Sequence, residues 1–261
     1  MFPILLQVVL PFTLSAIIVV LIMYIAERYG TKIGGIFGTL PSTIVIAFIF
    51  IALNQNVDFA AKSAAVVPAE LGINVIFLLL FALLVHRSIY VAFFGSLTIW
   101  AILSLLLFIF NLENIFISIS IYIILIIITI IVLERVKKIP SSGNVTVHYN
   151  PSKIALRGIL AGTVISIAVI LSNVGAIISG IFSVFPAILS STMLISFREH
   201  GPKFAAGMAK SMTVGISSVA VYAAAIHFLF PVYNIYIGTF AAYIVSIVVT
   251  LTIFKLRDKI R

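Results

Sequence analysis

Uninterrupted apolar stretches, each long enough for a helix to cross a lipid bilayer, dominate this sequence. Residues 115–133, for example, contain no charged side chain. A helix needs about 20 mostly apolar residues to span the bilayer core. Hydrophobic residues make up 63% of the 261 positions and charged residues only 9%, whereas soluble domains are roughly a quarter charged. The chain is therefore predicted to be an integral membrane protein. Its continuous apolar runs favour a helix bundle over a barrel, whose strands would alternate.

The predicted fold class is an all-α, polytopic membrane helix bundle with about nine transmembrane helices. The only sizeable polar segment, residues 134–153, contains Pro, Ser and Gly and separates the fifth helix from the sixth. The expected spans are residues 3–26, 33–53, 59–85, 88–110, 115–133, 155–174, 176–197, 203–229 and 233–254.

The basic residues predict the orientation of this bundle. If residues 134–157, which include Arg157, are cytoplasmic, 14 of the 16 Lys and Arg residues lie on the cytoplasmic side. We therefore expect a multi-pass protein of the cell membrane, with the N-terminus outside and the C-terminus in the cytoplasm. The net charge of +9 is explained by topology and anionic headgroups, so nucleic acid is not an expected partner. The expected surroundings are the lipid bilayer, and a homo-oligomer is left open.

A sequence repeat divides the chain into two similar halves. The stretch Gly30–Pro41 recurs 145 positions later as Gly175–Pro186, with six of twelve positions identical. A second block, Phe-Ala-Ala at 59–61 and 204–206, has the same offset. Five membrane crossings separate the copies, so they run in opposite directions, as in many secondary transporters. We expect two inverted four-helix repeats, 1–110 and 155–261, joined by a linker helix and loop over 111–154. The alternative is that membrane helices resemble one another by composition alone.

The second copy also resembles a known family. Residues 180–186 (Gly-Ile-Phe-Ser-Val-Phe-Pro), the charged turn at 197–201 and the Ala-rich helix that carries Lys210 are similar to the GlpM-like small four-helix membrane proteins. The first copy departs from this pattern at Leu40 and at residues 54–58. The resemblance implies a fused, duplicated version of a four-helix unit, and it supports the architecture more than any activity.

Pro41 and Pro186 are expected to interrupt helices near the bilayer midplane, because proline removes a helical hydrogen bond and clashes with the preceding turn. Backbone groups freed at this depth need protein, water or ligand partners. The hydroxyl groups that follow, on Ser42, Thr43, Ser190 and Ser191, make these interruptions candidate substrate sites. The alternative is close helix packing. Its candidate residues are Gly30, Gly34, Gly35, Gly38, Gly175 and Gly180.

Glu70 is the one acidic residue that falls well inside an expected span. An ionised carboxylate at the bilayer centre costs at least about 2.5–3.5 kcal/mol unless it is paired or protonated. We therefore expect Glu70 to face the bundle interior as a substrate or coupling group. Should the third helix begin later in the sequence, Glu70 would be interfacial instead.

Lys62 and Lys210 lie one or two turns inside the third and eighth expected helices. They are candidates for positive vestibules on opposite faces, or for lysines that extend toward the headgroups. The histidines are scattered, so no metal site is expected, and no cofactor is expected either. Hydrolase, zinc-protease and phosphate-binding motifs are absent from the sequence, so no enzyme activity is expected.

These features predict a transport protein, a secondary transporter or facilitator of a small solute or ion. Its site would lie at the midplane between the repeats, with Glu70 as the coupling group or as the counter-charge of a cationic substrate. The alternatives are a channel or pore with the same lining, and a non-transporting membrane subunit or assembly factor in which the glycine and proline motifs only pack helices.

Overall fold

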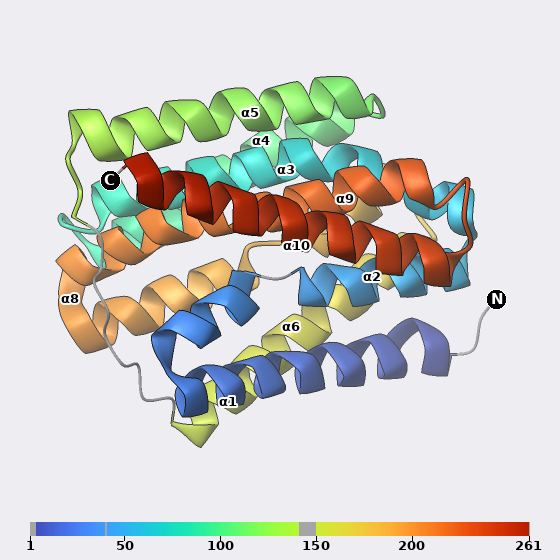
Figure 1. Cartoon of the computed structure of the whole chain (residues 1–261), viewed down its shortest axis with the longest axis horizontal. Coiled ribbons are helices and arrows are strands. Elements are labelled where there is room, and N and C mark those ends of the chain that lie inside the picture. The colour runs from blue at the N-terminus through green and yellow to red at the C-terminus, as the bar shows by residue number, and fades with distance from the viewer. Residues whose placement is uncertain (1–3, 40, 141–149, 261) are drawn as a thin grey trace.

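The computed structural model describes residues 4–39, 41–140 and 150–260, without the side chains of residues 6, 25–39 and 253–260, and this described part is all-α (Figure 1). A π-helical turn (Leu5–Val9) precedes α1, and another (Val132–Val136) continues α5. The helices are α1 (Leu10–Thr39), α2 (Ser42–Asn54), α3 (Val57–Leu84), α4 (Ile89–Ile109), α5 (Ile115–Ile131), α6 (Pro151–Leu171), α7 (Ala176–Ser183), α8 (Ala187–Gly215), α9 (Ser217–Leu229) and α10 (Ile235–Ile260).

Seven helical stretches of the described chain are long and apolar enough to cross a membrane. This is fewer than the nine expected spans, for two reasons. The second expected span, 33–53, is interrupted near Pro41, so that α2 has only 13 residues. The seventh and eighth expected spans lie within one stretch, Ala176–Leu229, which contains α7, α8 and α9. A multi-pass membrane protein is thus supported, and nine spans stay a prediction.

Asparagine side chains cap the starts of four of the described helices. Asn56 Oδ1 accepts a hydrogen bond from the Phe59 amide, and Asn114, Asn150 and Asn234 accept from amides in the first turns of α5, α6 and α10. Such caps satisfy backbone N–H groups that have no partner within the helix. Helix α6 consequently begins at Pro151, earlier than the predicted residue 155.

Helix α3 lies at the centre of the bundle (Figure 1). Of its apolar window, 83% is buried, against 22% for α4 and for α10. The outer helices expose large apolar side chains such as Phe94, Ile124 and Phe240. An apolar outer surface around a buried apolar helix is the arrangement expected of a bundle in lipid.

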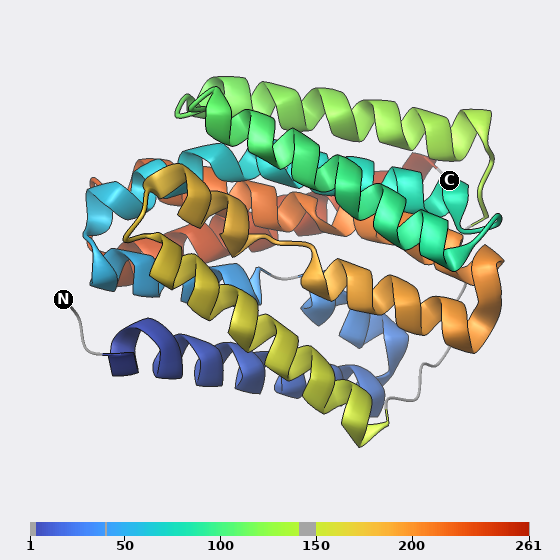
Figure 2. The same ribbon diagram turned by 180° about the vertical axis from the view of Figure 1, so that it is seen from behind.

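Helix α8 doubles back on itself near its middle. Gly201 has φ 78° and ψ −177°, a conformation that is essentially restricted to glycine, and Pro202 follows it. The part of α8 before Gly201 and the part after it, which leads into α9, therefore run in opposite directions (Figure 2). This turn explains how a single 54-residue helical stretch is accommodated.

Small residues let α1 and α6 approach closely. A Cβ atom at Gly162 would lie 2.7 Å from the Phe12 carbonyl oxygen, and one at Gly158 would lie 3.3 Å from that of Ala16. The two glycines are four residues apart and so share one helix face, a spacing typical of membrane helix contacts. Gly158 and Gly162 were not among the glycines predicted to pack helices.

Candidate functional site: two helix breaks and a buried carboxyl group

The chain leaves the helical conformation beside both prolines of the repeated motif. Helix α1 ends at Thr39 and α2 begins at Ser42, while α7 ends at Ser183 and α8 begins at Ala187. Both breaks lie near the middle of the bundle, where α2 and α7 are in contact (Figures 1 and 2). In Figure 2 the chain passes through the first break from right to left and through the second from left to right.

Neither break is capped by a neighbouring side chain in the usual way. Pro41 and Pro186 occupy the position before the first helical turn, and neither α2 nor α8 has a side-chain cap. Around the second break, short-range bonds join the Val184 amide to Ile181 and the Ala187 amide to Phe185. The break therefore retains backbone groups that need partners from other helices.

Asn74 on α3 supplies one such partner. Its Nδ2 donates a 2.8 Å hydrogen bond to the carbonyl oxygen of Val184. Trp100 on α4 packs edge-to-face on Phe185, with ring centroids 4.9 Å apart. Gly180 permits this approach, because a Cβ atom there would lie 2.2 Å from the Ser63 carbonyl oxygen of α3. The α7–α8 break is thus held directly against the central helix.

Glu70 lies one turn before Asn74 on α3 and is completely buried. Helix α3 begins at Val57, so Glu70 is near the middle of a 28-residue helix, as the sequence predicted for a carboxyl group inside the bundle. The Ser104 hydroxyl of α4 donates a 2.8 Å hydrogen bond to Oε1. The indole Nε1–H of Trp100 faces the same carboxyl group, without regular hydrogen-bond geometry. Glu70 Oε2 has no hydrogen-bond partner.

Pro68 lies inside α3, two residues before this carboxyl group. The Ala69 amide, one residue before Glu70, donates a 2.8 Å hydrogen bond to Ser118 Oγ on α5. Proline weakens the helical bonds around it, and this bond to a neighbouring helix supports the backbone there. We call Glu70, Asn74, Trp100, Ser104 and Ser118 the Glu70 cluster; each side chain is no more than 8% exposed.

Four members of the Glu70 cluster were missed from the sequence. Asn74 could have been found, because an amide four residues after Glu70 lies on the same helix face. Ser104, Ser118 and Trp100 lie in apolar helices that contain other hydroxyl residues, where a serine is common and gives no signal of its partner. Only the tertiary contacts bring them to the carboxyl group.

The predicted hydroxyl residues lie at both breaks but in different surroundings. Ser190 and Ser191 are buried in the first turns of α8, where Ser191 Oγ donates to the Ile188 carbonyl oxygen. Arg157, expected near the cytoplasmic end of its helix, is 7% exposed on α6 and donates to Thr192 Oγ1. Ser42 and Thr43 begin α2 and are half-buried. Pro41 and Pro186 are both buried.

The two vestibule candidates differ from each other. Lys62 is exposed near the start of α3. Lys210 on α8 donates a 2.9 Å hydrogen bond to the Ile139 carbonyl oxygen, and its Nζ lies 3.5 Å from Glu134 Oε1. Lys210 thus connects α8 to the segment that follows α5 through a hydrogen bond and an ion pair.

The packing-motif glycines also differ. Gly180 is tightly enclosed, as described above. A Cβ atom at Gly175, just before α7, would meet nothing within 4 Å, so close packing does not require a glycine there. Gly30, Gly34, Gly35 and Gly38 are in the helical part of α1, but their surroundings lie outside the described residues.

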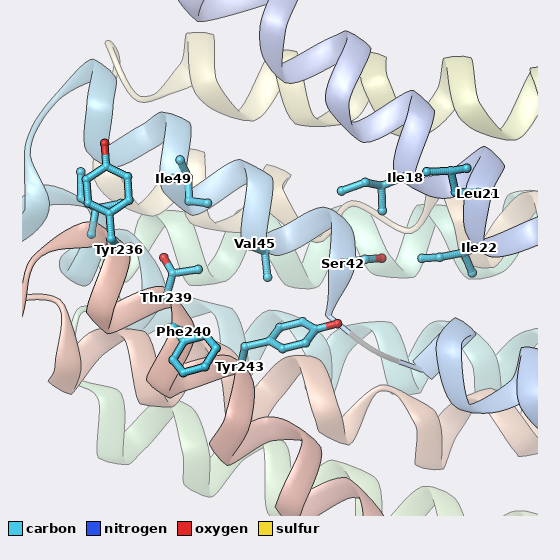
Figure 3. Close-up of a pocket in the computed structure, with 11 residues that line it drawn as sticks. Ile18, Leu21, Ile22, Ser42, Val45, Ile49, Tyr236, Thr239, Phe240 and Tyr243 are labelled. Carbon is cyan, nitrogen blue, oxygen red and sulfur yellow. The ribbon is translucent and has the colours of Figure 1, made fainter. Parts of the chain in front are cut away.

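A groove of about 520 Å³ runs between α1, α2 and α10 (Figure 3). Most of its lining is apolar, from Ile18 and Leu21 to Val45 and Phe240. Four residues with hydroxyl groups also line it, Ser42, Tyr236, Thr239 and Tyr243. The Tyr243 hydroxyl points toward the start of α2 (Figure 3). The groove therefore reaches the first helix break from the side of the bundle and not from the Glu70 cluster.

Within the described residues, no three His, Cys, Asp or Glu side chains gather where they could hold a metal ion. Comparison of this chain with known protein families, with curated proteins and with solved structures finds no match. The chemistry of the site is therefore inferred from these residues alone.

Proposed function

We propose that this chain is a secondary transporter or facilitator of a small solute or ion, with its site between the two helix breaks and Glu70 as the coupling group. The observation that carries the proposal is the direct attachment of the α7–α8 break to the Glu70 cluster. Asn74 binds the Val184 carbonyl oxygen, and Trp100 packs on Phe185. Movement at the break would therefore change the surroundings of the carboxyl group.

The proposal includes two inverted four-helix repeats, nine spans, and the relationship to GlpM-like proteins. It is supported by the opposite directions in which the chain passes through the two breaks (Figure 2). The N-terminal end of α1 and the C-terminal end of α10 also lie at opposite ends of the bundle (Figure 1). The two ends of a chain lie on opposite sides when it crosses the membrane an odd number of times. With the basic residues in the cytoplasm, the N-terminus is outside the cell membrane.

Gating between two closed arrangements fits the site better than an open pore. A channel that conducts past Glu70 would expose this carboxyl group to water, whereas its exposure here is 0%. Interrupted helices whose uncapped ends meet in the bundle are a recurrent way to build such gated sites. Uncapped amides at the starts of α2 and α8 would bind polar or anionic groups of a solute.

The absence of cysteine from the natural chain permits a clean accessibility test. Ser42→Cys and Ser190→Cys would be treated with a small, membrane-impermeant thiol reagent from each side of sealed vesicles. Ile124→Cys, on the lipid-facing side of α5, is the control that should stay unreactive.

A transporter predicts that the cysteine at 42 or at 190 reacts from one side at a time, and that a transported solute changes which side. Reaction from both sides together would favour a channel. No reaction from either side would favour the non-transporting subunit and overturn the proposal.

A solute panel tests the role of Glu70. Purified protein in liposomes on a solid-supported membrane would be challenged with small solutes, and the transient currents compared between wild type and Glu70→Gln. Glu113→Gln, at an exposed acid in the turn between α4 and α5, is the matched control. A solute current that survives Glu70→Gln unchanged would remove Glu70 from the mechanism.

A further inference from the structure

We infer that Glu70 and Asn74 form a proton-binding site, in which Glu70 is protonated on Oε2 and donates a hydrogen bond to Asn74 Oδ1. The consequence that the coupling ion is a proton rests on the proposed function. The site itself rests on the hydrogen bonds around these two side chains.

Two buried oxygen atoms in this site lack partners. Glu70 Oε2 and Asn74 Oδ1 are both inaccessible and without a hydrogen bond, on residues that are 0% and 1% exposed. Both atoms are acceptors when the carboxyl group is ionised, so they cannot satisfy each other. A single added proton converts Oε2 into a donor and leaves Oδ1 as the acceptor.

The other atoms of the two side chains fix this assignment. Asn74 donates through Nδ2 to the Val184 carbonyl oxygen, which can only accept, so the unpartnered atom of the amide is the oxygen. Ser104 occupies Oε1 of the carboxyl group. The free oxygens are therefore Oε2 and Oδ1, on residues four apart and hence on one face of α3.

The groups around the carboxyl do not neutralise a negative charge. Those facing it are the Trp100 indole and the Ser104 hydroxyl of α4. The titratable groups of α5 and α9 that contact α3 are Tyr122, which lies against Gly72, and His227, which is bonded to the Ala61 carbonyl oxygen nine residues before Glu70. The two ion pairs of the described residues join Lys153 to Glu199 and Lys210 to Glu134. An ionised carboxylate that is buried without a counter-charge is strongly disfavoured.

A metal cation fits the same space less well than a proton does. Metal ions such as Ca²⁺ and Mg²⁺ take about six or more oxygen ligands. Here two side-chain oxygens of the cluster are free, which is the number that one shared proton requires.

This arrangement links protonation to the helix break. The Asn74 oxygen accepts the hydrogen bond from protonated Glu70, and the Asn74 nitrogen donates to the Val184 carbonyl oxygen. If the break opens and Asn74 turns away, Glu70 loses its acceptor and releases the proton to water, and the carboxylate remains. Reprotonation restores the donor and allows the break to close.

Infrared spectroscopy of the purified chain in lipid tests the site without any transport assay. An ordinary Glu has a pKa near 4.3, so a carboxyl group that is still protonated at pH 7 is distinctive. We expect a carboxylic acid C=O band at pH 7 that shifts in D₂O and is lost in Glu70→Gln. The band should persist in Glu113→Gln, and Asn74→Leu should change its frequency because the acceptor is removed.

The absence at pH 7 of a band that depends on Glu70 would overturn the inference, as would a band that added Na⁺ abolishes. Thermal unfolding of each variant separates loss of the site from loss of the fold; if Glu70→Gln does not fold, the frequency change in Asn74→Leu decides. If the carboxylic acid band is present but no solute drives a current, the proton-binding site is supported and the proposed transport function is refuted. If a solute drives a current that does not depend on protons and the band is absent, the transport function is supported and the proton-binding site is refuted.

Discussion

Replacing Gly180 with alanine tests whether the repeated motif serves close approach of the α7–α8 break to the central helix. The added Cβ atom would lie 2.2 Å from the Ser63 carbonyl oxygen and 2.6 Å from Val66 Cγ1. An ordinary contact begins at 3.4 Å, so α7 must move away from α3 by about 1.2 Å. Because the Ser63 atom belongs to the backbone of α3, a rotamer change cannot relieve the clash.

The displacement acts on the site as well as on stability. The 2.8 Å bond from Asn74 to Val184 would lengthen to about 4 Å if α7 moved directly away, beyond the range of a hydrogen bond. Overpacking of this kind costs about 1–3 kcal/mol. One kcal/mol corresponds to about 2–4 °C in a chain of 150–250 residues, so we expect Tm to fall by roughly 2–12 °C.

The assay is thermal unfolding in lipid nanodiscs, with Gly175→Ala as the matched control from the same motif. A Cβ atom at Gly175 meets nothing within 4 Å, so its Tm should stay close to that of the wild type. Equal Tm values for the two variants would show that α7 does not press on α3 at this glycine, and would refute the packing derived from the structure.

Three further changes have defined outcomes. Gly201→Ala should lower Tm by several degrees although no atom lies within 4 Å of its new Cβ, because φ 78° with ψ −177° costs a non-glycine residue about 1–3 kcal/mol; an unchanged Tm would mean that α8 does not turn there. Lys210→Gln should speed trypsin cleavage after Lys138, because the bond to Ile139 and the ion pair are lost; Lys62→Gln is the control, and equal cleavage rates would contradict the contact. Ser104→Ala should cost about 1 kcal/mol and move the carboxylic band, because Glu70 Oε1 loses its donor; a band identical to that of the wild type would show that Ser104 does not bind Glu70.

Two readings of the glycine and proline motif were open from the sequence, a site and a packing face. In the second copy of the motif, the structure contains both a close helix contact and a helix break that is bonded to the Glu70 cluster. Gly180 brings α7 onto α3, and Pro186 ends the turn whose Val184 carbonyl oxygen Asn74 binds. Close packing is what brings the break to the carboxyl group, so the two readings do not exclude each other in this copy.

The groove between α1, α2 and α10 lies beside the helix break in the first copy of the glycine and proline motif. It leads from the outer face of α1 and α10 to Ser42 at the start of α2 (Figure 3). None of the described side chains that line it is charged. Within the proposed function, this is a side approach for an apolar or amphipathic solute, which the Ser42→Cys variant would report through reaction with a lipid-soluble thiol reagent.

The sequence alone determined that the chain is a bundle of apolar helices and that two prolines interrupt it. Both follow from local chemistry: apolar runs of membrane length cannot be exposed to water, and proline lacks the N–H that a helix needs. It also singled out Glu70, because a carboxyl group in an apolar run is costly wherever the helix lies. The predicted start of α6 was wrong although its local signal is strong, with Asn150 as the cap and Pro151 in the first turn.

Only the tertiary structure decided which groups meet Glu70 and its neighbours Ala69 and Asn74 on α3. Ser104, Ser118 and the Val184 carbonyl oxygen are 34, 48 and 114 residues away in the chain, and no local pattern relates them. Their meeting depends on how α4, α5 and the α7–α8 break pack on α3, which is decided by shape at small residues such as Gly180. In a bundle whose helices are all apolar, hydrophobic pattern does not select neighbours, so close packing and the few buried hydrogen bonds do.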